Sequence, residues 1–172
     1  VAINALERFV GDFGLANKLA LTRLSDAKHD EPVAVIGAGP AGLSCAYQLA
    51  RRGYKNVMGV DRSRYLIRLA KKRAQTEGLA VTFKEGDARN PRLPESSMDC
   101  VAIMGNSFGY FSNKQDDEKV LTAVGKLLRP TGQLVLDITD GAHMAEHFDR
   151  RSWEWIDEHH FVCRERTISQ DG

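Results

Sequence analysis

Three glycines near residue 40 form the segment whose chemistry is easiest to interpret. Gly37, Gly39 and Gly42 follow the spacing Gly-x-Gly-x-x-Gly within VAVIGAGPAG. In such a loop the first glycine permits a tight turn, the second lets backbone amides approach a ligand, and the third lets the next helix pack closely. The N–H groups at the start of that helix suit a pyrophosphate or a carboxylate. The spacing predicts a nucleotide-binding turn, and a strand-to-helix turn without a ligand is the alternative interpretation.

An acidic residue, Asp61, ends the next apolar segment, NVMGVD. At the end of the second strand of a dinucleotide-binding fold, a carboxylate accepts hydrogen bonds from ribose hydroxyl groups and disfavours a 2′-phosphate. Asp61 or Ser63 would also suit as the N-cap of the following helix, and the two roles are compatible. We therefore predict that Asp61 binds a ribose, and that NADP is not the ligand.

Composition and charge exclude several classes of protein. The 172 residues carry 24 Lys and Arg against 23 Asp and Glu, which gives no electrostatic case for binding nucleic acid or an anionic membrane. The longest apolar runs are too short to span a membrane, and the N-terminus lacks the apolar core of a signal peptide. Cys45, Cys100 and Cys163 form no CxxC pair, which favours a cytoplasmic protein with free thiols. His143 and His147 lack a third ligand at a defining spacing, so no metal site is expected.

Strand-like and helix-like segments alternate along most of the chain. Short buried-strand patterns are separated by amphipathic helices and short loops, which is typical of a parallel sheet with helices on both faces. The tail alternates apolar and polar residues over 161–168, which indicates a strand or hairpin outside this core. We expect strands at 33–36, 56–61, 80–87, 98–105 and 132–140, and helices at 3–23, 43–52, 64–77 and 116–128.

These elements predict an α/β fold with a Rossmann-like, doubly wound parallel sheet of about five strands and a C-terminal β extension. Residues 1–31 are expected to form a helical segment and linker, and residues 32–142 the nucleotide-binding core. Residues 143–172 are then the C-terminal extension, a substrate-side strand or lid. Trp153 and Trp155 would either close over a substrate or seal a hydrophobic flank.

The segment before residue 54 resembles one known family. ALERFVGDFG and PVAVIGAGPAGLSCAYQLARRGY are similar to the FAD-binding start of the glutamate synthase small-subunit type of oxidoreductase. That resemblance implies FAD, and makes an FAD- or NAD-binding oxidoreductase fragment the alternative function. The later parts of that family, a strand ending in Glu and a Pro-Gly-Gly segment, do not follow in this sequence.

From about residue 50 onward the sequence resembles the class I S-adenosylmethionine-dependent methyltransferases instead. The similar segments are GVDRS, VTFKEGDARNPRLPESSMDCVAIM, GNSFGYF and VLTAVGKLLRPTGQLVLD. The chain departs from that family where Val35 replaces an acidic residue before the first glycine, and where Pro40 follows the second. It also stops before the family's last helix and two final strands, so we expect a truncated and composite methyltransferase fold with impaired activity.

The second resemblance implies a set of cofactor contacts. The glycine-loop amides would face the methionyl carboxylate and ribose, Asp61 the ribose hydroxyls, and Asp87 the adenine amino group. Phe108, Tyr110 and Phe111 would either form the wall of the pocket or belong to the core. The implied cofactor-binding residues are Gly37, Gly39, Gly42, Asp61, Arg62, Asp87, Ala88, Asn106 and Ser107.

The chemistry implied by the same resemblance is an in-line transfer of a methyl group from S-adenosylmethionine. Such a transfer depends on positioning and on excluding water, so no catalytic acid or base is expected. GNSFGYF lacks the Asn/Asp-Pro-Pro-Tyr pattern of enzymes that methylate the amino groups of bases, which favours a small-molecule acceptor. An exposed sheet edge would favour a homodimer. An inactive nucleotide-binding module is the third alternative.

Overall fold

The computed structural model describes residues 13, 16, 17 and 27–167. The helix expected over 3–23 falls largely outside these residues. The chain divides into two compact units, Val1–Asp137 and Ile138–Gly172. The described elements of the first unit are β1 (Val33–Ile36), α2 (Pro40–Arg51), β2 (Val57–Asp61), α3 (Arg64–Thr76), β3 (Val81–Glu85), β4 (Met98–Ile103), α4 (Lys114–Leu127) and β5 (Leu128–Leu136).

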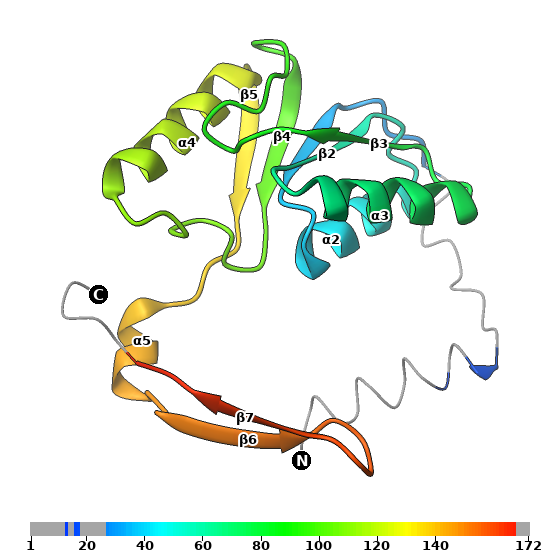
Figure 1. Cartoon of the computed structure of the whole chain (residues 1–172). Coiled ribbons are helices and arrows are strands. Elements are labelled where there is room, and N and C mark those ends of the chain that lie inside the picture. The colour runs from blue at the N-terminus through cyan, green and yellow to red at the C-terminus, as the bar shows by residue number, and fades with distance from the viewer. Residues whose placement is uncertain (1–12, 14–15, 18–26, 168–172) are drawn as a thin grey trace. The chain divides into compact units, whose positions relative to one another are not determined.

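The first unit contains a five-stranded sheet with the order β3-β2-β1-β4-β5 (Figure 1). All four pairings are parallel, and Ile36 of β1 lies between Val60 of β2 and Ile103 of β4. The strand order reverses beside β1, because the chain crosses from the edge strand β3 back to β4. In sheets of this kind ligands bind at the carboxyl ends of the strands, at this reversal. The prediction of a Rossmann-like sheet of five strands is confirmed.

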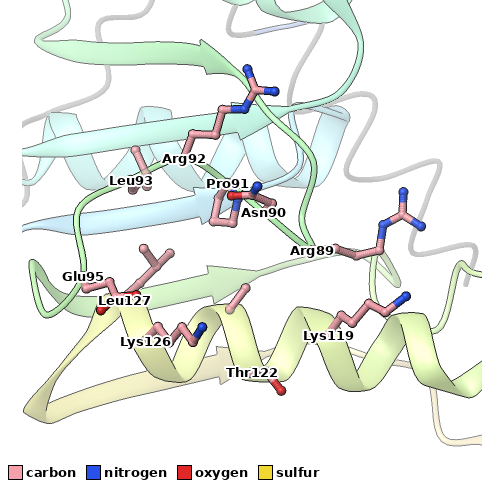
Figure 2. A pocket seen from close by; sticks show the side chains of 11 residues that line it. Arg89, Asn90, Pro91, Arg92, Leu93, Glu95, Lys119, Thr122, Lys126 and Leu127 are labelled. Atoms are coloured by element: carbon pink, nitrogen blue, oxygen red, sulfur yellow. The ribbon is translucent and has the colours of Figure 1, made fainter.

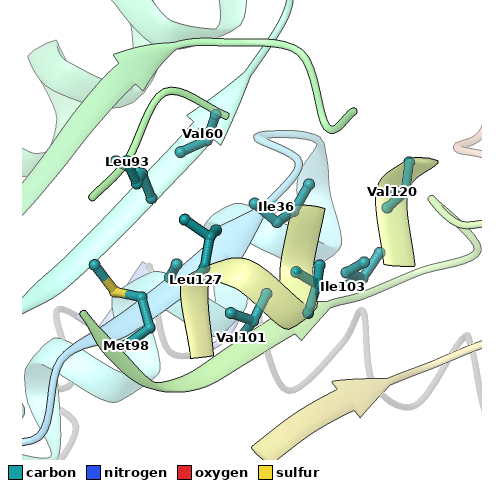
Figure 3. Packing of buried hydrophobic residues seen from close by; sticks show 10 residues of the cluster. Ile36, Val60, Leu93, Met98, Val101, Ile103, Val120 and Leu127 are labelled. Atoms are coloured by element: carbon teal, nitrogen blue, oxygen red, sulfur yellow. The ribbon is translucent and has the colours of Figure 1, made fainter. Parts of the chain in front are cut away.

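Both faces of the sheet are covered by helices, as the alternating side chains of the strands require. Ala34, Ile36 and Ile103 point to the face covered by α4, where Val120 and Leu127 complete the cluster (Figure 3). The opposite face carries Val35, Phe83 and Ala102, and packs against α2 and α3. Figure 1 shows α4 on the other side of the strands from α2 and α3. The two clusters make the carboxyl edge of the sheet a rigid base for the loops above it.

Several element boundaries differ from those expected. Helix α2 begins at Pro40 rather than residue 43, because proline suits the first helical position and Gly39 is the N-cap. The strands expected to end at 87 and 105 end at Glu85 and Ile103. The residues that follow them belong to loops at the carboxyl edge. Strand β5 ends at Leu136 rather than residue 140, and the carbonyl oxygen and side chain of the next residue, Asp137, accept hydrogen bonds from the loop after β4.

The second unit contains α5 (Gly141–Glu146) and a hairpin of β6 (Arg151–Trp155) and β7 (Phe161–Glu165). The two strands are antiparallel, with Trp155 opposite Phe161, so the predicted β extension is confirmed as a hairpin. None of the described residues 138–167 is buried. The side chains of Trp153, Trp155 and Phe161 are 67%, 60% and 57% exposed. A two-stranded ribbon of this kind has little stability of its own.

Candidate functional site

A cleft of about 650 Å³ lies at the carboxyl edge of the sheet. Residues from the ends of β1, β2 and β3 line it together with residues of the loop that follows β4. This is the position at which a ligand is expected in such a sheet. The lining residues are Ile36, Gly37, Gly39, Pro40, Val60, Asp61, Arg62, Ser63, Leu66, Gly86, Asp87, Ala88, Ser107, Tyr110 and Phe111.

The three glycines of the loop have different reasons to be glycine. Gly37 has a φ of 106°, which side chains rarely tolerate, and a Cβ there would lie 3.3 Å from Ser107 Oγ. At Gly42 a Cβ would lie 2.0 Å from the carbonyl oxygen of Gly37, so this glycine lets α2 approach the end of β1. At Gly39 a Cβ would meet nothing within 4 Å. Gly37 and Gly42 are therefore required by the fold, whereas Gly39 leaves open space at the cleft.

The side chain of Asp61 ties the glycine loop to β2. Its Oδ2 accepts a hydrogen bond of 2.6 Å from the backbone N–H of Ala38, and its Oδ1 accepts one of 2.6 Å from the N–H of Ser63. Ser63 is the N-cap of α3, and its hydroxyl oxygen accepts from the N–H of Leu66. Each carboxylate oxygen has a second lone pair, so Asp61 retains the capacity to accept from a ligand.

The carboxylate of Asp87 is held by its neighbour but one, Arg89. Asp87 Oδ1 accepts from Arg89 Nε at 2.9 Å and from the Arg89 backbone N–H at 2.9 Å, and Oδ2 accepts from Nη2 at 2.7 Å. The remaining nitrogen, Nη1, donates to Oδ2 of Asp116 at 2.8 Å. The hydrogen bonds from Arg89 lower the pKa of Asp87 to about 2. Asp87 is therefore ionised at neutral pH and can only accept hydrogen bonds from a ligand.

The loop after β4 is held by Asp137, at the end of β5. The N–H of Gly105 donates to Asp137 Oδ2 at 3.0 Å, and the N–H of Asn106 donates to the Asp137 carbonyl oxygen at 3.2 Å. Gly105 and Asn106 both have positive φ, 66° and 59°. The turn that results brings Ser107 beside Gly37, and the Ser107 hydroxyl donates to the carbonyl oxygen of Met104.

The structure brings together seven of the nine residues expected at the cofactor. Gly42 and Asn106 do not line the cleft; Gly42 is a buried residue of α2 itself, and Asn106 belongs to the turn before Ser107. Of the three aromatic residues, Tyr110 and Phe111 line the cleft, and Phe108 packs against the core cluster below α4. The seven residues at the cleft are Gly37, Gly39, Asp61, Arg62, Asp87, Ala88 and Ser107.

Sequence analysis missed Arg89, Asp116 and Asp137. Arg89 follows the Gly-Asp-Ala segment directly, and its charge next to Asp87 was a usable signal. Asp116 is 9% exposed and also accepts from Lys119 Nζ at 2.8 Å. No pattern along the chain connects Asp116 to Arg89, or Asp137 to Gly105, because each pair meets only when the strands and α4 are assembled.

A second cavity, of about 410 Å³, lies between the segment after β3 and helix α4 (Figure 2). Arg89 and Arg92 come from the segment, Lys119 and Lys126 come from the helix, and Glu95 is the acidic residue of the lining. Arg89 and Lys119 are already paired with Asp116. This groove therefore has less free positive charge than its composition indicates.

Two further findings concern other kinds of site. Among the residues that the structure describes, no three His, Cys, Asp or Glu side chains gather as a metal site would require. None of the described helices is long and apolar enough to cross a membrane.

Comparisons with known proteins assign the family. Residues 33–132 match the family described as "Methyltransferase domain", so the chain belongs to this family. A solved S-adenosylmethionine-dependent methyltransferase from Clostridium acetobutylicum superposes with a TM-score of 0.71 over 95% of this chain and 61% of its own, at 18% identity. At that identity the likeness shows the fold. The family and this structural neighbour support S-adenosylmethionine as the cofactor of the chain.

Curated relatives include methyltransferases of different kinds. Demethylmenaquinone methyltransferase of Thermus thermophilus is 36% identical over 80 residues, which cover 46% of this chain and 34% of the relative. The human eEF1A lysine and N-terminal methyltransferase is 26% identical over 135 residues, 73% of this chain and 19% of the relative. The chain thus spans about a third or less of the length of these relatives.

A shorter stretch matches an oxidoreductase. The NADP(+)-dependent formate dehydrogenase subunit beta of Moorella thermoacetica is 46% identical over 55 residues, 32% of this chain and 8% of the relative. This match is partial, and does not assign the chain to an oxidoreductase family.

The residues at the cleft fit S-adenosylmethionine chemically. Two carboxylates, Asp61 and Asp87, can accept from hydroxyl and amino groups, and Asp87 is held in its ionised form. No side chain in the part of the chain that the structure describes caps the start of α2, so backbone N–H groups there are available to a carboxylate. The volume of about 650 Å³ is in the usual range for small-molecule sites.

Proposed function

We propose that this chain binds S-adenosylmethionine in the cleft and transfers its methyl group to a small-molecule acceptor. The observation that carries the proposal is the convergence of Gly37, Asp61, Asp87 and Ser107, from the ends of four different elements, on one cleft. A nucleotide cofactor needs recognition of its carboxylate, ribose and base at once. The proposal assigns one of these tasks to each part of the cleft.

Each residue then has a role that follows from its position. The amides of Gly39 and of the start of α2 would hold the methionyl carboxylate, and Asp61 would accept from the ribose hydroxyls. Asp87 would accept from the adenine amino group, with Arg62 and Ala88 beside the ring. Ser107 would lie near the reacting centre.

When bound, S-adenosylmethionine supplies a methyl group already activated on a sulfonium. The protein has to position the acceptor and to exclude water, and residues that neither donate nor accept a proton can do both. Tyr110 and Phe111 are suited to exclude water from this part of the cleft, because both line it with large aromatic rings.

Binding is tested by calorimetric titration with S-adenosylhomocysteine, the product form of the cofactor. We expect saturable binding, weakened by about 1–3 kcal/mol in Asp61→Ala, since the partners of a half-buried carboxylate are then left unpaired. The absence of heat at high micromolar ligand would contradict the proposal. Saturable binding without methyl transfer to any acceptor would support the inactive nucleotide-binding module instead.

The acceptor class is tested with methyl-labelled S-adenosylmethionine and a cell extract divided by size. We expect label in the small-molecule fraction, because the loop GNSFGYF lacks the Pro-Pro pattern of base methyltransferases. Label in the protein fraction would replace this acceptor class with a protein, the substrate named for the human relative.

We also propose that residues before about 53 share their origin with the FAD-binding start of an oxidoreductase, joined to a methyltransferase. The quoted likeness of the glycine loop and the partial match to the formate dehydrogenase subunit support this origin. Both families place a βαβ unit at this point, so the join is compatible with the fold. The function of such a loop is tested by adding FAD: a yellow protein that does not bind S-adenosylhomocysteine would favour the oxidoreductase alternative.

Two smaller proposals concern the state of the protein. All three cysteines are unpaired in the structure, which supports a reducing, cytoplasmic location. Among the described strands β5 pairs with β4 alone, and an open strand edge supports pairing with a second copy. Sedimentation of the full chain at several concentrations tests the homodimer.

A further inference from the structure

Arg89 connects three parts of the cleft that are distant along the chain. Its guanidinium binds both oxygens of Asp87, at the base of the cleft, and Oδ2 of Asp116, in the first turn of α4. The same guanidinium carbon lies 4.6 Å from the centre of the Phe111 ring, which lines the cleft. One planar side chain therefore sets the relative positions of an acceptor group, an aromatic wall and a helix.

The anchor of Arg89 is itself well held. Asp116 is buried, and it accepts from Lys119 Nζ at 2.8 Å and from Asn113 Nδ2 at 3.2 Å. Hydrogen bonds from Lys119, Asn113 and Arg89 lower the pKa of Asp116, so this anchor stays charged. A guanidinium fixed at one end by a buried carboxylate can hold a second carboxylate in one orientation, because its nitrogens are coplanar.

This arrangement determines which hydrogen bonds Asp87 can offer to a ligand. An ionised carboxylate accepts and does not donate, and three of its lone-pair positions are occupied by donors from Arg89. A free position would pair with an amino group, but would repel a carbonyl oxygen at the same place. The oriented carboxylate can therefore distinguish a 6-amino purine from a 6-oxo purine.

We propose that Arg89 is a positioning residue that makes the cleft specific for the amino group of the base. The inference rests on the proposed function, in which Asp87 faces the adenine. Arg89 itself need not touch the ligand. Its contribution is the orientation of Asp87, and loss of Arg89 should reduce the choice between bases more than it reduces binding of the rest of the nucleoside.

The test compares two ligands that differ only at the base. S-adenosylhomocysteine carries the 6-amino group, and S-inosylhomocysteine carries a carbonyl oxygen in its place. The ratio of their dissociation constants, measured by calorimetry on the full chain, reports specificity for the amino group. A change in overall stability affects both ligands equally and leaves the ratio unchanged.

We expect the wild-type protein to prefer S-adenosylhomocysteine by about tenfold or more, since a mismatched polar group stays unpaired. In Arg89→Met the ratio should fall towards one. Arg89→Lys, which keeps the charge but not the planar fork, and Asp116→Asn, which removes the charge of the anchor, should give intermediate ratios. If Arg89→Met does not fold, the ratios measured for Arg89→Lys and Asp116→Asn test the inference in its place. Arg92→Met is the matched control, because it removes a positive charge from the same segment, on the wall of the groove in Figure 2.

The inference would be overturned if the ratio of dissociation constants stayed at its wild-type value in Arg89→Met, or in both Arg89→Lys and Asp116→Asn. It would also be overturned if the ratio fell as far in Arg92→Met as in Arg89→Met. A wild-type protein that binds both ligands equally would overturn it while leaving the proposed function in place. A wild-type protein that binds neither ligand would overturn both.

Discussion

The contacts that stabilise one side of the cleft differ in kind from those that stabilise the other side. On the side of β1 and β2 the contacts involve the main chain: Gly37 N–H donates to the Val60 carbonyl at 2.8 Å, and Ala38 N–H donates to Asp61. On the side of β3 and α4 they involve charged side chains, with Arg89 between Asp87 and Asp116. The first side leaves no room for added atoms at Gly42, whereas the second depends on charge.

This difference separates two ways of disturbing the site. The hydrogen bond between the main chains of Gly37 and Val60 does not titrate, but an added methyl group at Gly42 can prevent the helix from approaching the strand. Ion pairs tolerate changes of volume, but weaken when a carboxylate is protonated. The β1–β2 side should therefore respond most to changes of size, and the β3–α4 side most to pH.

The largest effect is expected from Gly42→Ala. Its Cβ would lie 2.0 Å from the carbonyl oxygen of Gly37, a backbone atom that cannot move without shifting the loop. We expect the free energy of unfolding to fall by about 3 kcal/mol or more, the upper range for overpacking. Circular dichroism during urea unfolding measures it. Gly39→Ala is the matched control, because its Cβ would meet no atom within 4 Å, and it should cost only about 1 kcal/mol or less, since alanine is a poorer N-cap than glycine. Equal losses in the two variants would mean that the packing of α2 on β1 is not the cause.

A smaller loss is expected from Asp61→Asn. The amide keeps one acceptor oxygen, but its NH₂ would face the N–H of Ala38 or of Ser63. We expect the free energy of unfolding to fall by about 1–3 kcal/mol, and the binding of S-adenosylhomocysteine to weaken about tenfold or more. Ser63→Ala keeps its backbone N–H and removes the hydroxyl that caps α3, so it should lower the free energy of unfolding by about 1 kcal/mol and weaken binding less than Asp61→Asn does. Similar binding defects in both variants would contradict the role of Asp61 in holding the loop.

On the other side of the cleft, pH should reveal the contribution of Asp87. Arg89 lowers its pKa from 3.8 to about 2 in the folded state, so its stabilisation is complete above pH 3.8 and is lost as the pH falls towards 2. That contribution is at most about 2 kcal/mol. Asp87→Asn cannot titrate, so the stability difference between wild type and variant should shrink over this window. Urea unfolding at a series of pH values measures it, and a constant difference would show that Asp87 is not held by charge.

The smallest effect is expected from an ion pair outside the cleft. Arg129 Nη1 lies 2.8 Å from Asp99 Oδ2, and the two side chains are 44% and 28% exposed. Arg129→Met should lower the free energy of unfolding by less than about 1 kcal/mol, and 1 M salt should remove this difference between variant and wild type. Binding of S-adenosylhomocysteine should not change. A loss as large as that of Asp61→Asn would mean that surface pairs matter here as much as contacts at the cleft.

Much of the core could be predicted from the sequence because its signals are local. Val33–Ile36 is a continuous apolar run, the glycine spacing predicts a strand-to-helix turn, and Asp61 ends the next strand. These features specify a strand, a turn and an acidic residue without reference to distant parts of the chain. The boundaries were less accurate, since α2 begins at Pro40 and α4 at Lys114, both earlier than the apolar periodicity indicates.

The two sides of the cleft also differ in how far the sequence alone predicts them. The sequence by itself determined the β1–β2 side of the cleft, because Gly37, Gly42 and Asp61 act through backbone geometry within one βαβ unit. Only the tertiary structure decided the other side. Arg89 meets Asp116, 27 positions further along, only after α4 has packed on the sheet, and Gly105 meets Asp137 only after β4 and β5 have paired. Contacts between charged side chains follow from the register of strands and the packing of helices, which no local spacing records.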